Sequence, residues 1–125
     1  MKKLYPVVFH PEDAGYSVSV PDMPGCFTQG ETMEETLEMI QDAVGLYLDG
    51  EELPEATAPE KLEIAAGEFI MMVEYDSVAY AKKHNNKSVK KTLSIPAWLN
   101  EIAEAAHINF SKVLQEALKK QLDIG

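Results

Sequence analysis

The feature that most constrains this fold is a short β-like segment, VKKTLSIP at residues 89–96, with no neighbour in sequence to pair with. Its apolar face carries Val89, Leu93 and Ile95. Its polar face carries Lys90, Thr92 and Ser94. Everything after it has helical periodicity. Since folded proteins rarely bury backbone N–H and C=O groups without partners, this segment must pair with something outside its own neighbourhood.

Two short helices are expected after the strand. Pro96 suits the first turn of a helix because its missing N–H is not needed there, and this helix is expected to reach about His107. Asn109 is the best N-cap for the second helix. The helices have apolar stripes, formed by Leu99, Ile102 and Ala106 in the first and by Val113, Leu114, Ala117, Leu118 and Leu122 in the second.

Strand and helices together make a segment too small to fold alone. Below ~40 residues a domain usually needs disulfides, a metal or oligomerisation. The single cysteine, Cys26, excludes an intramolecular disulfide and a multi-thiolate metal site. We therefore expect two chains to pair their 89–95 segments antiparallel over a shared core. The predicted core residues of this homodimer are Leu93, Ile95, Leu99, Ile102, Leu114 and Leu118.

Such a ribbon leaves its polar face exposed. A two-stranded β-ribbon fits the major groove of B-DNA, so Lys90, Thr92 and Ser94 are candidate base-contacting residues. The alternative is a solvated strand face. The start of the second helix favours anions, which makes Asn109, Phe110, Ser111 and Lys112 candidate phosphate contacts. Helix capping alone also explains Asn109 and Ser111.

The N-terminal part has the pattern of a small α+β layer. Strands are expected at 3–9, 15–20, briefly at 26–28, and at 68–75, where near-continuous apolar character indicates burial on both faces or a central position. Thr32 and Glu35 have capping-box spacing ahead of an amphipathic helix that ends near Gly50. The predicted organisation is a domain at 1–80, a polar hinge at 81–88 and the strand–helix–helix module at 89–125.

Charge divides along the same line. The chain has 11 Lys, no Arg and 21 acidic residues. Residues 1–80 hold three Lys against 17 acidic residues, a net charge of −14, and the remainder is +4. This asymmetry indicates two surfaces with different partners, although solubility alone is an alternative. The lone cysteine and the lack of a long apolar window favour a cytoplasmic protein with no membrane partner.

Both halves carry a family resemblance. KTLSIPAWLNEIAEAAHINFSKVLQEAL resembles a ribbon–helix–helix DNA-binding module. PDMPGCFTQGETMEE at 21–35, with Tyr5–Phe9 and Gly15–Tyr16, resembles HicB-family antitoxins. The resemblance implies a partial RNase H-like β-β-β-α-β fold that binds a small basic RNA-cleaving toxin, HicA, and occludes its active site. It also implies autorepression through operator double-stranded DNA, by a dimer or by a tetramer joined through the N-terminal domains.

Unlike most sequence-specific DNA-binding proteins, this chain contains no Arg. The bidentate Arg–guanine contact is excluded, and Lys90 reaches guanine acceptors with less geometric selectivity. Operator specificity is therefore expected to depend more on Thr92, Ser94 and DNA shape.

Two other functions are alternatives. One is an orphan repressor whose N-terminal domain senses a small ligand. The other is a residual metal-dependent hydrolase around Asp22, but turn and helix-surface positions explain these carboxylates better. His10, His84 and His107 have no ligand spacing, and Cys26 has no nearby base. We expect no catalytic residue, metal or cofactor.

Overall fold

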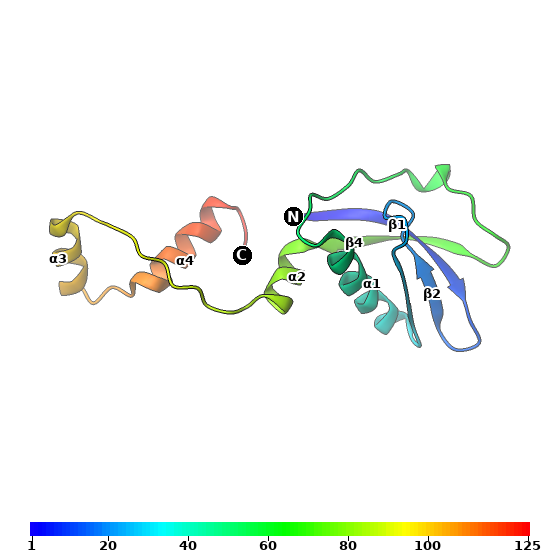
Figure 1. The fold of residues 1–125 in the computed structure, drawn as a ribbon, viewed down its shortest axis with the longest axis horizontal. Helices are drawn as coiled ribbons and strands as arrows, with labels where there is room; N and C mark the ends of the chain where they lie inside the picture. Colours follow the sequence, from blue (N-terminus) through cyan, green and yellow to red (C-terminus); the bar gives the residue numbers. More distant parts are fainter. The chain divides into compact units, whose positions relative to one another are not determined.

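The computed structural model describes residues 1–125 and divides them into two compact units, Met1–Lys87 and Ser88–Gly125. Figure 1 shows the elements of both units, coloured along the sequence. The elements of the first unit are β1 (Lys2–Pro11), β2 (Tyr16–Ser19), β3 (Phe27–Gly30), α1 (Met33–Leu48), a 3-10 turn η1 (Pro59–Lys61), β4 (Phe69–Asp76) and α2 (Ser77–His84). Those of the second are α3 (Ala97–Ala105) and α4 (Phe110–Gln121). None of these helices combines the length and apolar character needed to cross a membrane.

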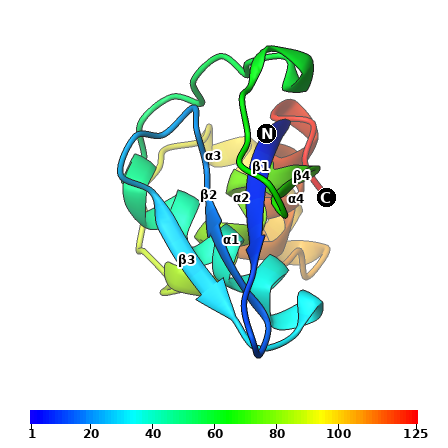
Figure 2. The same ribbon diagram turned by 90° about the vertical axis from the view of Figure 1, so that its right-hand side faces the viewer.

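The four strands form one antiparallel sheet in the order β3-β2-β1-β4, with neighbouring strands visible side by side in Figure 2. The central strand β1 contains Pro6, which has no N–H to donate. Its position is tolerated because β2 pairs only with Val8–Pro11, so no β2 residue lies opposite Pro6. The expected strands and the β-β-β-α-β order are confirmed. The expected central position of the last strand is wrong, because β4 lies at an edge.

The core of this unit lies between one face of the sheet and α1 (Figure 1). Thr32 caps α1, since its hydroxyl accepts a hydrogen bond of 3.0 Å from the Glu35 N–H. The apolar stripe of α1 then faces alternate residues of the strands. The buried core consists of Tyr5, Val7, Phe9, Val18, Val20, Met23, Cys26, Ile40, Val44, Leu48, Val73 and Tyr75.

Helix α2 was not expected from sequence. It begins at an N-cap, Asp76, whose carboxylate accepts hydrogen bonds from the Val78 and Ala79 N–H groups at 3.0 and 3.1 Å. Its C-terminal turn is held on α1, because Lys83 Nζ and His84 Nε2 lie 3.1 and 3.3 Å from the Asp42 carboxylate. Residues 81–84 are therefore helical and not part of the expected hinge, and the first unit extends to Lys87.

Position 15 requires glycine for two reasons, its backbone conformation and the lack of space for a Cβ atom. Its φ is +84°, and a Cβ there would lie 2.0 Å from the Gly30 carbonyl oxygen. Gly15→Ala is expected to lower the free energy of unfolding by about 2–4 kcal/mol, from left-handed strain plus a clash with backbone. Gly67→Ala is the matched control, since its φ of +86° is similar but its Cβ would meet nothing within 4 Å. Denaturant unfolding followed by circular dichroism measures both, and equal losses would contradict the clash.

The second unit has helices but no strand. Residues 85–96 form no regular structure. Helix α3 ends two residues before the expected end because His107 adopts a left-handed conformation, with φ +56°. The Ile108 N–H then bonds the Ala103 carbonyl and the His107 N–H bonds the Glu104 carbonyl, at 3.1 and 3.0 Å. No residue of this unit is buried.

Candidate functional site

The predicted base-contacting segment is accessible in the single chain. Lys90, Thr92 and Ser94 are all exposed. Residues 89–95 make no pair with the sheet of the same chain, which consists of β1 to β4 alone. Pairing of this segment between two chains stays a prediction.

The predicted dimer-core residues are largely uncovered. Leu93, Ile102 and Leu118 are 58%, 61% and 51% exposed. Ile95 and Leu99 are also exposed, and Leu114 is half-buried. The physical cause is size, because helices of 9 and 12 residues cannot enclose their own apolar stripes. Apolar surface gathered in this way marks an interaction site.

The start of α4 has the expected cap. Asn109 is the N-cap, and its side-chain oxygen accepts a hydrogen bond of 3.1 Å from the Lys112 N–H. The N–H groups of Phe110 and Ser111 have no partner within the helix, as is general for the first turn. Asn109 as the cap is confirmed. Its use with Phe110, Ser111 and Lys112 as a phosphate site stays a prediction.

The charge asymmetry changes at the observed boundary. The first unit, 1–87, holds six Lys against 17 acidic residues, a net charge of −11, while the second holds five Lys against four and is +1. Part of the basic excess expected after residue 80 thus belongs to α2. There the hydrogen bond from Lys83 holds the pKa of Asp42 below its usual range. The acidic character of the first unit is the larger electrostatic feature.

The carboxylate considered for hydrolysis has a structural role. Asp22 accepts a hydrogen bond of 3.1 Å from the Thr57 N–H, and the Thr57 hydroxyl also donates to it. These bonds fix the long connection after α1 to the turn before β3. Burial raises the pKa of the Cys26 thiol, which keeps it protonated. No group of three or more His, Cys, Asp or Glu side chains is placed to hold a metal ion.

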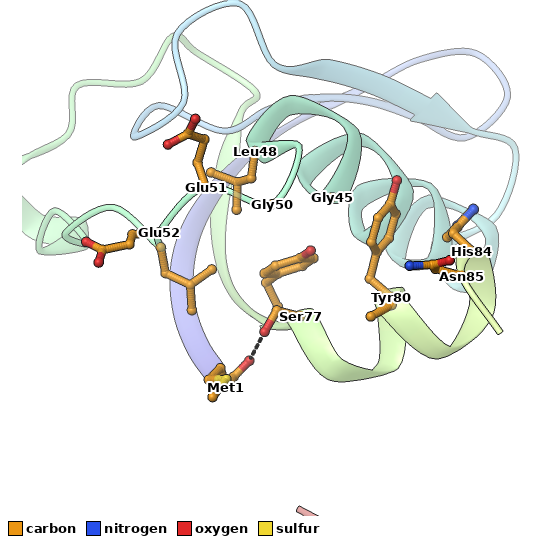
Figure 3. A pocket seen from close by; sticks show the side chains of 13 residues that line it. Met1, Gly45, Leu48, Gly50, Glu51, Glu52, Ser77, Tyr80, His84 and Asn85 are labelled. Carbon is orange, nitrogen blue, oxygen red and sulfur yellow. Dashed lines mark hydrogen bonds between the residues drawn. The ribbon is translucent and has the colours of Figure 1, made fainter. Parts of the chain in front are cut away.

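A cavity of about 720 Å³ in the first unit was not expected from sequence (Figure 3). Leu48 of α1 and Tyr75 of β4 line it together with Tyr80 of α2. Near its floor the Ser77 hydroxyl donates a hydrogen bond of 3.0 Å to the Met1 carbonyl. Sequence reasoning missed this cavity because one of its walls, α2, was read as part of a hinge.

Comparisons with known proteins indicate one family. A family model described as the HicB-like antitoxin of bacterial toxin-antitoxin systems matches residues 5–118. An uncharacterised 14.9 kDa protein of Haemophilus phage HP1 is 38% identical over 63 residues, 46% of this chain and 47% of that protein. Antitoxin HicB 1 of Photorhabdus laumondii is 56% identical over 41 residues, 32% of this chain and 26% of that protein. The chain thus spans less than half the length of either relative.

The fold comparison covers far more of the chain. A toxin–antitoxin complex from Streptococcus pneumoniae contains a chain that is 28% identical, with a TM-score of 0.57, and the match covers 97% of this chain and 99% of that one. The likeness thus includes both units, whereas the curated relatives match shorter stretches. The family is not catalytic in its antitoxin role. With the family model spanning both units, the chain belongs to the HicB-like antitoxins of bacterial toxin–antitoxin systems.

Proposed function

We propose that this chain neutralises a small, basic, HicA-like RNA-cleaving toxin and represses its own operon. The unit at 1–87 binds the toxin and occludes its active site. Its net charge of −11 supports this role, because a complementary field accelerates association with a basic partner and disfavours wrong ones. In this proposal the β-β-β-α-β order of the unit is the partial RNase H-like arrangement that the family resemblance implies.

The unit at 88–125 is the DNA-binding and dimerisation module in this proposal. The observation that carries it is a unit with no buried residue whose apolar residues gather on the segment and helices expected to pair. Two copies of residues 89–95 form an antiparallel ribbon, and α3 and α4 of both chains close a shared ribbon–helix–helix core beneath it. Association removes exposed apolar surface that a single chain leaves in water.

The ribbon then presents its polar face to DNA. Lys90, Thr92 and Ser94 from both chains lie in the major groove, where hydroxyls and ammonium groups bond base edges. The first turn of α4 holds a backbone phosphate on the N–H groups of Phe110 and Ser111, with Lys112 beside them. The phosphate contacts set the position of the ribbon, and the base contacts select the sequence.

Thr92→Ala is expected to weaken operator binding more than non-specific binding. Loss of one base-edge hydrogen bond per chain costs about 1 kcal/mol or more, roughly fivefold in affinity. Ser88→Ala, which removes a hydroxyl just outside the ribbon, is the control and should bind as the wild type does. Gel-shift titrations on operator and on random DNA of equal length measure the difference. An equal loss on both DNAs would assign Thr92 a structural role.

The test of toxin neutralisation is co-expression with the product of the adjacent short reading frame. We expect a small basic protein that stops growth alone, co-purifies with this chain and is inactive toward RNA in the complex. Gel-shift on DNA upstream of the gene, with and without that protein, tests autorepression. A neighbouring product that neither binds nor harms cells would contradict the antitoxin function.

The cavity between α1, β4 and α2 favours one second candidate, a repressor that senses a small ligand. Its size is within the range of small-molecule sites, and its walls are largely apolar. This function requires operator binding that changes with a metabolite and no tight protein partner. The co-expression experiment separates the two functions, because only the antitoxin retains a basic protein through purification.

A further inference from the structure

Strand β4 has the sequence of a central strand and the position of an edge strand. Its residues FIMMVEYD are almost continuously apolar, yet only β1 pairs with it. Met72 is 41% exposed and Ile70 is partly buried, because these side chains point to the sheet face opposite the core, where Val73 and Tyr75 are buried. Proteins usually protect a long apolar edge with charge, proline or a covering segment, because free N–H and C=O groups there recruit other strands.

The contacts of the Gln41 side chain show which backbone N–H and C=O groups of β4 point away from β1. Gln41 of α1 donates a hydrogen bond of 2.7 Å to the Glu74 carbonyl and accepts one of 3.3 Å from the Asp76 N–H. These two residues therefore point their backbone groups away from β1. Since the direction alternates along a strand, Ile70 and Met72 point theirs outward as well. Pro6 lies opposite Met72 and has no N–H, which fits a pair without hydrogen bonds.

Gln41 thus occupies one end of the edge in the way that an incoming strand would. Its amide pairs with one C=O and one N–H, as a peptide group does. The outward groups of Ile70 and Met72 are left without a protein partner. The open part of the edge is therefore short and defined, and its side chains are apolar.

The acidic residues around the β4 edge favour a cationic strand over a second copy of β4 as its binding partner. Glu74 is exposed at one end, and Glu34 and Glu38 are exposed on the side of α1 that carries Gln41. Gln41 holds α1 against β4 at Glu74 and Asp76, and Glu38 lies one helical turn before Gln41 on the same side of the helix. A second copy of β4 fits poorly, because the antiparallel register that pairs Ile70 with Met72 also places Glu68 opposite Glu74. A strand with an apolar centre and flanking cations fits well.

We propose that the open edge of β4 at Ile70–Met72 receives a β-strand of the basic toxin, extending the sheet to a fifth strand. This inference rests on the proposed antitoxin function and names the surface that performs it. Main-chain hydrogen bonds to Ile70 and Met72 supply affinity, and the acidic border of α1 selects a cationic strand.

Amide hydrogen exchange of the full chain tests the proposal residue by residue. The probe is the small basic protein that co-purifies with this chain. On its addition, exchange at Ile70 and Met72 should slow by about tenfold or more. Exchange at Met71 and Val73 should change little, because their N–H groups already bond β1. This alternation distinguishes strand addition from general stabilisation.

A pair of variants gives a second readout. Met72→Pro removes the outward N–H and is tolerated on an edge strand, whereas Met72→Ala shortens the same side chain and keeps the N–H. We expect Met72→Pro to bind the basic protein about tenfold more weakly than Met72→Ala. Circular dichroism of both variants establishes that the sheet is intact.

Three outcomes would overturn the inference. In the first, the complex forms without protection at Ile70 and Met72, and Met72→Pro and Met72→Ala bind the basic protein equally well. This outcome contradicts binding at the β4 edge but not the antitoxin function. Protection that appears without the basic protein and grows with concentration assigns the edge to a second copy. A wild-type chain that binds no basic protein removes the antitoxin function and this inference together.

Discussion

Replacing Leu93 with Asp is expected to turn the dimer into monomers and abolish operator binding. Leu93 is 58% exposed in the single chain, and alternation places it on the face that two chains are proposed to bury. Each dimer would then bury two unpaired carboxylates, at a cost of about 3–5 kcal/mol each. Such a penalty weakens association by at least ~10⁴-fold.

Thr92→Asp is the matched control, because it places the same charge one residue away on the ribbon's other face. It should abolish DNA binding through repulsion of phosphates and leave the dimer intact. Sedimentation velocity of both full-length variants across micromolar concentrations separates the two effects. A Leu93→Asp chain that sediments as the wild-type dimer does would contradict the shared core.

Local signals in the sequence predicted most elements correctly. Thr32 and Glu35 located the start of α1, because a cap depends on residues three positions apart. Asn109 located the start of α4 for the same reason. The strands of the first unit followed from β-like runs bounded by turns. These features are encoded within one or two turns of chain, so reading the sequence alone recovers them.

Features that depend on distant contacts were missed or misplaced. Helix α2 is held by Asp42, about 40 residues earlier, so its polar sequence AKKH looked like a hinge. The apolar sequence of β4 indicated burial on both faces, but strand order is set by pairing with β1 and not by composition. The cavity depends on α2 and was lost with it.

In the candidate DNA-binding site too, local features were predictable from sequence and features that depend on distant contacts were not. The residues of the ribbon and of the α4 cap could be named from alternation and capping, which are local. Whether two ribbons pair is decided between chains, and the sequence argues it only through the 38 residues of the second unit and their lack of a core. The exposure of Leu93 and Ile102 adds an independent reason for the same dimer.

Operator binding is expected to fall steeply with salt. In the proposed dimer Lys90 and Lys112 from each chain lie at the DNA, which makes at least four cations. Releasing their counterions gives a slope of log affinity against log salt of about −3.6, so affinity drops about 100-fold between roughly 50 and 200 mM salt. The slope is set by the number of lysines placed at the DNA and not by the net charge of the second unit, which is only +1.

Single lysines test where that attraction originates. Lys112→Ala removes one cation per chain, so the slope should become shallower by about 1.8. Lys61→Ala removes a lysine from the acidic first unit and should leave the slope unchanged, because that residue is not placed at the DNA. Fluorescence anisotropy on labelled operator at several salt concentrations measures both. A flat titration, or equal slopes for the two variants, would contradict the placement of the α4 N-terminus on a phosphate, since a phosphate contact cannot be made without displacing counterions.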